Sequence, residues 1–265
     1  MTSILLSSSS GIADMHQTEA LYIDIKTRSV CDRRKVDPWT YAGNWATDVW
    51  VMGFAVGHGE VQLWHPGEPL PEALIETISS GAPIFCYDAP FHHALFAALM
   101  RPRYGWPMPL LEQWGCAAAM AAAVKLPNGL DEAATAKGVG GPKDKEARSL
   151  IRRMARPRSK THFRCLSCGM MTCDDHEMWK TSLVWWDGVE DRALLDSYCI
   201  QDVLTGRALV DGLPPLSESQ HEAWLRDQVA NDHSTWLEDF FSELSTDDRE
   251  ISAEMPDSNR KVFRI

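Results

Sequence analysis

The order of apolar segments between residues 20 and 100 is the feature that most constrains the fold. Leu21 to Ile25 (LYIDI) is an apolar run with β-branched residues, which predicts a buried strand. Two further strands, 50–56 and 60–64, flank the turn Gly57-His58-Gly59, a pattern typical of a β-hairpin. A helix, a strand and a second helix are then expected at 71–79, 83–87 and 91–100. This order predicts an α/β arrangement in which an antiparallel sheet gains one further strand and is covered by helices.

The second half of the chain is expected to be mostly helical. Helices are predicted at 112–125, 130–137, 145–154, 190–209 and 218–244. Pro157 ends the helical pattern before a cysteine-containing loop, and Pro214-Pro215 stops the long helix that follows this loop.

Composition narrows the class of protein. The chain has 265 residues, 45% of them hydrophobic, which suits one sizeable domain with appendages and excludes wholesale disorder. No run approaches the ~18 apolar residues of a membrane span, and the N-terminus lacks the basic start of a signal peptide. We therefore expect a flexible leader at 1–18, no membrane partner and a cytoplasmic location. The seven cysteines are then read as thiols or metal ligands before disulfides.

Charge is divided unevenly along the chain. The formal net charge is −11, which on its own argues against a nucleic-acid partner. Residues 214–265, however, contain twelve acidic and five basic residues and so contribute −7. The segment 143–164 contains nine basic and two acidic residues, a local charge of +7.

The basic segment has two interpretations, which the charge alone leaves open. It is either a surface that contacts phosphates or a solvated helix face followed by a basic loop. The candidate nucleic-acid-binding residues are Lys143, Lys145, Arg148, Arg152, Arg153, Arg156 and Arg158.

Three acidic positions form a candidate site. Phosphodiester hydrolysis with two metal ions needs clustered carboxylates, because Mg²⁺ prefers oxygen ligands. Asp24 lies near the end of the first strand, and Asp202 lies on the long helix, one turn after Tyr198. Asp88 follows the strand at 83–87, with His92 four residues later on one helical face.

These residues lie in strings that resemble a known family. LYIDIKTRS, YDAPFHHALF and YCIQDV look like the three motifs of DEDD-type 3'-5' exonucleases, in particular the proofreading domains of phage and bacterial family A DNA polymerases. Linking strings such as LWHPGEP and LPPLSESQ also resemble that group, so the likeness covers residues 20–236. It implies a ribonuclease H-like fold, with a mixed sheet of an antiparallel hairpin plus parallel strands flanked by helices. It also implies 3'-5' exonuclease activity on single-stranded or frayed DNA ends with Mg²⁺ or Mn²⁺ as cofactor.

By this resemblance, Asp24 and Asp202 would hold the metal, Tyr198 would orient the attacking water, and Asp88 or His92 would complete the site. Two positions depart from the family pattern. Lys26 stands where the family's first motif, Asp-x-Glu, has its glutamate, and His92 stands at the second-motif aspartate. An ammonium at this position repels divalent ions, so metal affinity should collapse unless Lys26 swings away. Lys26 could instead pair with Asp24, Asp88 or Asp202 and replace the ions.

The cysteine loop is a second candidate site. Cys165, Cys168, Cys173 and His176 bring four potential zinc ligands within twelve residues, with a C-x2-C pair at the start. A structural Zn²⁺ site is predicted here, and reduced surface thiols are the alternative interpretation. A zinc-ordered loop would lie between the basic segment and Trp185-Trp186.

Two functional hypotheses follow. The first is a 3'-5' exonuclease that acts on DNA ends, and the second is a catalytically silent, zinc-containing module that binds nucleic acid or a separate polymerase. The sequence after about residue 245 does not resemble the family's continuation, which favours a truncated polymerase remnant or a replaced end. The expected divisions are an exonuclease-like domain at 19–213 with a Cys/His loop at 162–177, an amphipathic helical extension at 214–244 and a polar tail at 245–265.

Overall fold

The computed structural model describes residues 20–140, 145–158, 163–165 and 181–230. A five-stranded mixed sheet lies at its centre, with the strand order β3-β2-β1-β4-β5. The strands are β1 (Leu21–Arg28), β2 (Asp48–Val56), β3 (Gln62–Trp64), β4 (Ile84–Cys86) and β5 (Trp114–Cys116). β1, β2 and β3 pair antiparallel, whereas β4 pairs parallel with both β1 and β5. The α/β class predicted from the sequence is confirmed, and the sheet is consistent with a ribonuclease H-like fold.

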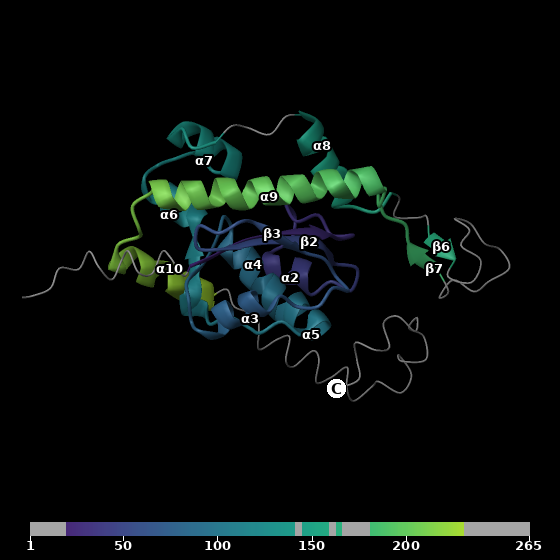
Figure 1. Cartoon of the computed structure of the whole chain (residues 1–265), viewed down its shortest axis with the longest axis horizontal. Coiled ribbons are helices and arrows are strands. Elements are labelled where there is room, and N and C mark those ends of the chain that lie inside the picture. Colours follow the sequence, from purple (N-terminus) through teal and green to yellow (C-terminus); the bar gives the residue numbers. More distant parts are fainter. Residues whose placement is uncertain (1–19, 141–144, 159–162, 166–180, 231–265) are drawn as a thin grey trace, which may run out of the picture.

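Helices cover both faces of this sheet (Figure 1). One face carries α6 (Ala117–Ala123), α7 (Leu130–Lys137), α8 (Lys145–Met154) and α9 (Val189–Gly212). The other carries α2 (Pro38–Ala42), α3 (Glu72–Ser79), α4 (Ala89–Leu95), the π-helical turn η1 (Phe96–Met100) and α5 (Arg101–Tyr104). The remaining elements are the 3₁₀ turn η2 (Leu111–Gln113), the helix α10 (Glu218–Ala230) and a separate hairpin of β6 (Phe163–Cys165) and β7 (Thr181–Leu183).

The alternation of side chains along β1 explains why both faces are covered. Leu21, Ile23 and Ile25 are buried in the core shared with α2 to α5, and Tyr22 is buried in the core shared with α9. Successive side chains of a strand point to opposite faces, so Asp24 and other even-numbered residues of β1 share the α9 face. The candidate acidic site therefore lies under the long helix.

Two of the predicted helices differ from the structure. The helix expected at 112–125 begins only at Ala117, because residues 114–116 form β5 and pair with β4. The helix expected at 91–100 instead runs from 89 to 104 as α4, η1 and α5. Pro102 lacks an amide hydrogen, and the wider turns of η1 lie just before it. The part of the helix expected at 231–244 lies outside the described residues.

Side-chain contacts hold α9 to the sheet along its length. Near its N-terminal half, His65 Nε2 lies 3.1 Å from both carboxylate oxygens of Asp196. Near its C-terminal half, Arg207 donates to the carbonyl oxygens of Gly57 at 3.1 Å and Gly59 at 2.8 Å, in the hairpin turn between β2 and β3. The helix is therefore fixed to the β2–β3 hairpin at both of these points.

A glycine sets how closely α9 approaches the sheet. A Cβ added to Gly53 on β2 would lie 3.0 Å from Cys199 Sγ and 3.1 Å from Val203 Cγ2, both on α9. Gly53 is also the residue that pairs with Asp24 in the β1–β2 register. The absence of a side chain here lets α9 come close to the strand that carries the candidate site.

None of the helices in the described part of the chain combines the length and apolar character that crossing a membrane requires.

We predict that Gly53→Ala lowers the free energy of unfolding by about 1–3 kcal/mol, because the added methyl group overpacks the contact with α9. Urea denaturation measures this change. Gly206→Ala on α9 is the matched control, since a Cβ there meets nothing within 4 Å. The control should be neutral or stabilising by up to about 1 kcal/mol. Equal stability of the two variants would contradict the prediction.

Candidate functional site

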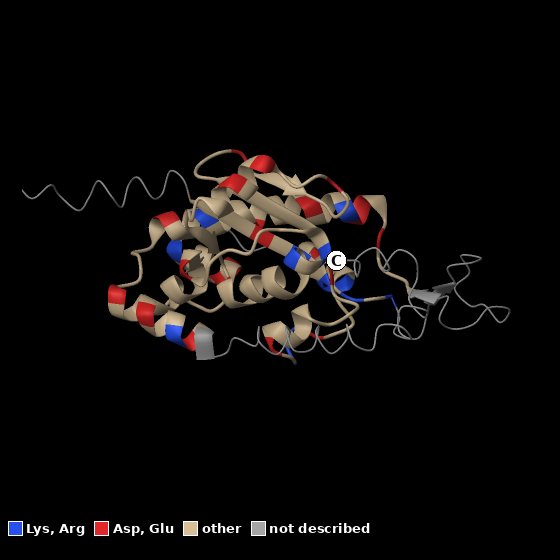
Figure 2. Cartoon of the chain, turned by 90° about the horizontal axis from the view of Figure 1, so that it is seen from below, with Lys and Arg blue, Asp and Glu red and all other residues tan. Residues whose placement is uncertain are grey.

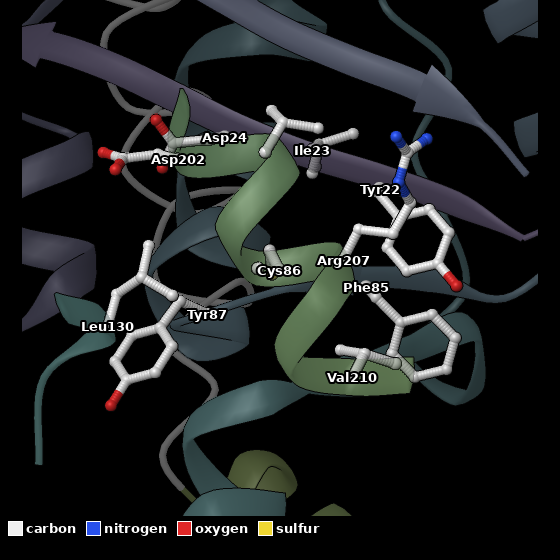
Figure 3. A pocket seen from close by; sticks show the side chains of 12 residues that line it. Tyr22, Ile23, Asp24, Phe85, Cys86, Tyr87, Leu130, Asp202, Arg207 and Val210 are labelled. Carbon is white, nitrogen blue, oxygen red and sulfur yellow. The ribbon is translucent and has the colours of Figure 1, made fainter. Parts of the chain in front are cut away.

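The site is built from β1 and α9. Asp24 and Lys26 are two residues apart on β1 and therefore share one face of the strand. A register irregularity follows directly, between Lys26 and Thr27, where a β-bulge increases the local twist. Asp202 lies in the C-terminal half of α9 and is buried over this face. Figure 3 shows Asp24 and Asp202 close together beside the α9 ribbon.

An ammonium group joins the two carboxylates. Lys26 Nζ lies 2.8 Å from Asp24 Oδ2 and donates a short hydrogen bond to Asp202 Oδ2. The side chains of Lys26 and Asp202 are only 13% and 7% exposed, so water screens these pairs little. Burial alone would lower the pKa of Lys26, but the charges of Asp24 and Asp202 outweigh it and hold this pKa above its ordinary value. Lys26 therefore remains charged at any physiological pH.

A thiol from α9 completes the packing around Asp24. Cys199 Sγ lies 3.5 Å from the Asp24 carbonyl oxygen and 3.7 Å from its Oδ2. Burial raises the pKa of this thiol well above its usual value, so Cys199 stays neutral. The sequence alone led us to treat Cys199 only as one of seven cysteines, and its contact with the site was missed. The available signal was its spacing, because it lies three residues before Asp202 on the same helical face.

His92 is neutral and already engaged. Its Nδ1 lies 2.8 Å from the Asp88 carbonyl oxygen, and its Nε2 lies 3.3 Å from the backbone amide nitrogen of Ile25. This pairing fits a ring with hydrogen on Nδ1 and an accepting Nε2. Burial lowers the pKa of His92 despite the Asp24 carboxylate 3.9 Å from its Nε2. The Nε2 lone pair, which a metal ion would need, faces the Ile25 amide instead.

The structure places the Asp88 carboxylate outside the Lys26 cluster. Asp88 lies at the start of α4, and its side chain forms an ion pair with Arg33. The Arg33 guanidinium also lies 3.8 Å from the centre of the Phe91 ring. Of the three possible partners predicted for Lys26, the structure pairs it with Asp24 and Asp202.

The residues present do not fit a divalent metal ion at this position. Lys26 occupies the space between the carboxylates that would bind it, and at ~4 Å an ammonium repels a divalent ion by about 8 kcal/mol at an effective dielectric near 20. Within the described ranges, no group of three or more His, Cys, Asp and Glu side chains is placed to hold a metal ion. The predicted Mg²⁺ or Mn²⁺ role of Asp24 and Asp202 has no support from this arrangement.

The other predicted site residues lie elsewhere. Tyr198 is partly buried against the cluster formed by Trp50, Leu195 and Cys199, one turn of α9 before Asp202. Cys165 ends β6, where it pairs with Thr181 of β7. The remaining proposed zinc ligands, Cys168, Cys173 and His176, lie outside the described residues, so the zinc site stays a prediction.

Much of the basic segment is paired with acidic residues. Arg153 lies 2.8 Å from Asp191, and Arg156 lies 2.7 Å from Asp32. Arg148 lies 3.8 Å from two carboxylates of α7, those of Asp131 and Glu132. The guanidinium of Arg158 lies 4.9 Å from the centre of the Trp186 ring, and Arg152 is exposed. Lys143 lies outside the described residues, and only the backbone of Lys145 is described.

We predict that Lys26→Met lowers the free energy of unfolding by about 3–5 kcal/mol at pH 7, because the buried carboxylate of Asp202 and the partly buried one of Asp24 lose their counter-charge. Chemical denaturation measures this loss. Introducing Lys26→Met into an Asp24→Asn/Asp202→Asn background provides the control, where the loss should be much smaller. A similar loss in both backgrounds would show that the ion pairs are not its cause.

We also predict an acid-dependent loss of stability that comes from His92. Its folded pKa lies below its unfolded value of about 6.5, so its contribution is present above that pH and is lost as pH falls through the folded pKa. Urea unfolding at pH 7.5 and pH 5 should therefore show a smaller pH effect in His92→Gln than in the unmodified protein. His58→Gln, which alters a histidine that is 60% exposed, serves as the comparison variant. Identical pH effects in all three proteins would contradict the assignment.

Comparison with known proteins adds no relative: no protein-family model matches the chain, and no curated protein matches it.

Proposed function

We propose that this chain is a cytoplasmic, exonuclease-like domain that binds the 3' ends of single-stranded or frayed DNA and does not hydrolyse them. The observation that carries the proposal is the position of Lys26, whose ammonium bridges Asp24 and Asp202. These are the two acidic residues that the motif resemblance assigns to metal binding. A resident cation there replaces the ions that hydrolysis needs but leaves the scaffold intact.

The arrangement around Lys26 favours binding over catalysis. Asp24, Asp202 and Lys26 together carry one net negative charge, whereas the two carboxylates without the lysine would carry two. A DNA end is polyanionic, so each negative charge removed from the site reduces its repulsion. The cluster therefore accepts a phosphate-bearing strand more readily than two unpaired carboxylates would, and it offers no metal-activated water to attack the strand.

The geometry of His92 also supports binding without hydrolysis. In the motif resemblance this position carries a carboxylate, but His92 is neutral and uses both ring nitrogens for backbone contacts. A change at Lys26 alone would leave the site one acidic ligand short. We therefore expect that hydrolysis requires changes at both positions.

The proposal predicts DNA binding without cleavage. Fluorescence anisotropy with a labelled single-stranded decanucleotide should show binding whose affinity falls as salt rises, because phosphate contacts release counterions. Gel analysis of the same oligonucleotide with Mg²⁺ and then Mn²⁺ should show no shortening. The variant Lys26→Glu/His92→Asp should shorten it from the 3' end in a metal-dependent manner.

Three results would count against this function. Hydrolysis by the unmodified protein would show that Lys26 does not silence the site. Failure to bind any oligonucleotide at low salt would remove the nucleic-acid role. Equal affinity for a blunt duplex and a single strand would contradict the preference for frayed or single-stranded ends. Arg226→Glu, on the exposed face of α10, is the matched control for a charge change away from the site.

A further inference from the structure

A cleft of about 380 Å³ lies between the segments after β1 and after α8, and the proposed end-binding cluster does not use it. Its walls come from the loop that follows β1, residues 30–36, and from residues 156–157 after α8. Val30, Val36 and Pro157 give it apolar sides. Lys35 and Arg156 contribute positive charge to its lining, and Asp32 contributes a carboxylate. A volume of this size falls in the range of small-molecule sites.

The walls of the cleft are fixed to each other. The backbone amide of Ser29 donates to the carbonyl oxygen of Ala155 at 3.0 Å, which joins the end of β1 to the end of α8. Arg156 pairs with Asp32 across the cleft at 2.7 Å, and within the 30–36 loop the Lys35 amide donates to the Asp32 carbonyl oxygen at 2.8 Å. The cleft is therefore preformed, and a ligand need not order it.

Lys35 is the cation that is available to a ligand. It is exposed, and no described carboxylate lies within 4.0 Å of its ammonium. Arg156 is 49% exposed, and a guanidinium has five N–H donors, so its pair with Asp32 leaves donors for a second anion. In the right-hand half of Figure 2, segments of Lys and Arg lie beside segments of Asp and Glu. The cleft thus combines apolar walls with two donors suited to phosphate.

The chain leads directly from the Lys26 cluster to this cleft. Val30 is four residues beyond Lys26, and at 3.3 Å per extended residue they are separated by at most about 13 Å. Arg33, in the same loop as Lys35, forms an ion pair with Asp88, whose carbonyl oxygen contacts His92. A few nucleotides of a single strand cover this distance.

We propose that the cleft binds an internal nucleotide of the strand whose 3' end lies at the Lys26 cluster. Its phosphate would contact Lys35 and Arg156, and its base would lie against Val30, Val36 and Pro157. The inference rests on the proposed function and adds a second contact upstream of the end. An acidic peptide fits this cleft less well, because its charges are not each accompanied by a flat apolar group.

The test uses the full chain and a single-stranded thymidine decanucleotide. Lys35→Gln should weaken binding about fivefold at low salt and Lys35→Glu about tenfold or more, and both should reduce the salt dependence by about one phosphate contact. The control Arg226→Glu makes the same change in charge as Lys35→Glu, but on α10, away from α8 (Figure 1). It should leave the affinity and its salt dependence unchanged.

A second measurement reports on the cleft itself. Cys31 lines the cleft and is partly exposed, whereas Cys86, Cys116 and Cys199 are buried. The bound decanucleotide should slow alkylation of Cys31, followed by peptide mass spectrometry, in the unmodified protein and not in Lys35→Glu. This readout does not depend on how tightly the 3' end is held.

The outcomes separate this inference from the proposed function. Normal decanucleotide binding by Lys35→Glu, with no protection of Cys31 in the unmodified protein, would overturn the cleft assignment and leave end binding intact. No binding by the unmodified protein would overturn both. If Lys35→Glu weakens the binding of thymidine monophosphate but not that of the decanucleotide, the assignment to an internal nucleotide is overturned. The same holds if a glutamate decapeptide competes for the protein as well as the decanucleotide does.

Discussion

The ion pairs of Lys26 with Asp24 and Asp202 are the interaction on which the candidate site depends. They connect the central strand of the sheet to the long helix above it, and they do so with little exposure to water. A buried and a partly buried carboxylate across the interface of a strand and a helix would be costly without a cation. The lysine side chain satisfies that requirement within the protein itself. The protein itself therefore supplies the cation that holds β1 and α9 together at this point.

In the proposed function, Lys26 takes the place of metal ions while the packing around it stays the same. Gly53 allows α9 to come close to β1 and β2, and Cys199 fills the space beside Asp24. Neither residue depends on whether the cation between the carboxylates is an ammonium or a metal ion. The difference is that a lysine cannot activate water or stabilise charge on a leaving oxygen as a divalent ion does. In the proposed function, the same geometry serves binding in place of hydrolysis.

The sequence predicted those parts of the structure that local patterns determine. The hairpin around Gly57 and the long helix α9 follow from turn chemistry and apolar periodicity, and both were confirmed. β5 was missed because three residues before an alanine-rich run carry little strand signal. Its formation depends on pairing with β4, where a Cβ at Gly115 would clash with the Phe85 ring. Non-local pairing of this kind has no signature within a short window of sequence.

The candidate site, like the fold, could be predicted only in part from the sequence. The partners of Lys26 could be foreseen as a set, since the motif order brought Asp24, Asp88 and Asp202 together, but the choice between them could not. The Asp88 side chain forms an ion pair with Arg33 in place of Lys26. Arg33 lies 55 residues earlier, in a loop whose sequence has no distinctive pattern. The hydrogen bonds of His92 also depend on the backbone of β1, which sequence spacing does not position.

The attachment of α9 has a consequence for motion in the site. His65 fixes this helix in its N-terminal half, and Arg207 fixes it to the β2–β3 turn, on either side of Asp202. Segments held at several points along their length open only in large cooperative units. The carboxylate of Asp202 therefore cannot withdraw from the ammonium by local fraying of the helix. Amide hydrogens of β1 and central α9 should exchange with solvent together, at the rate of global opening, while those of the loop after β1 exchange independently.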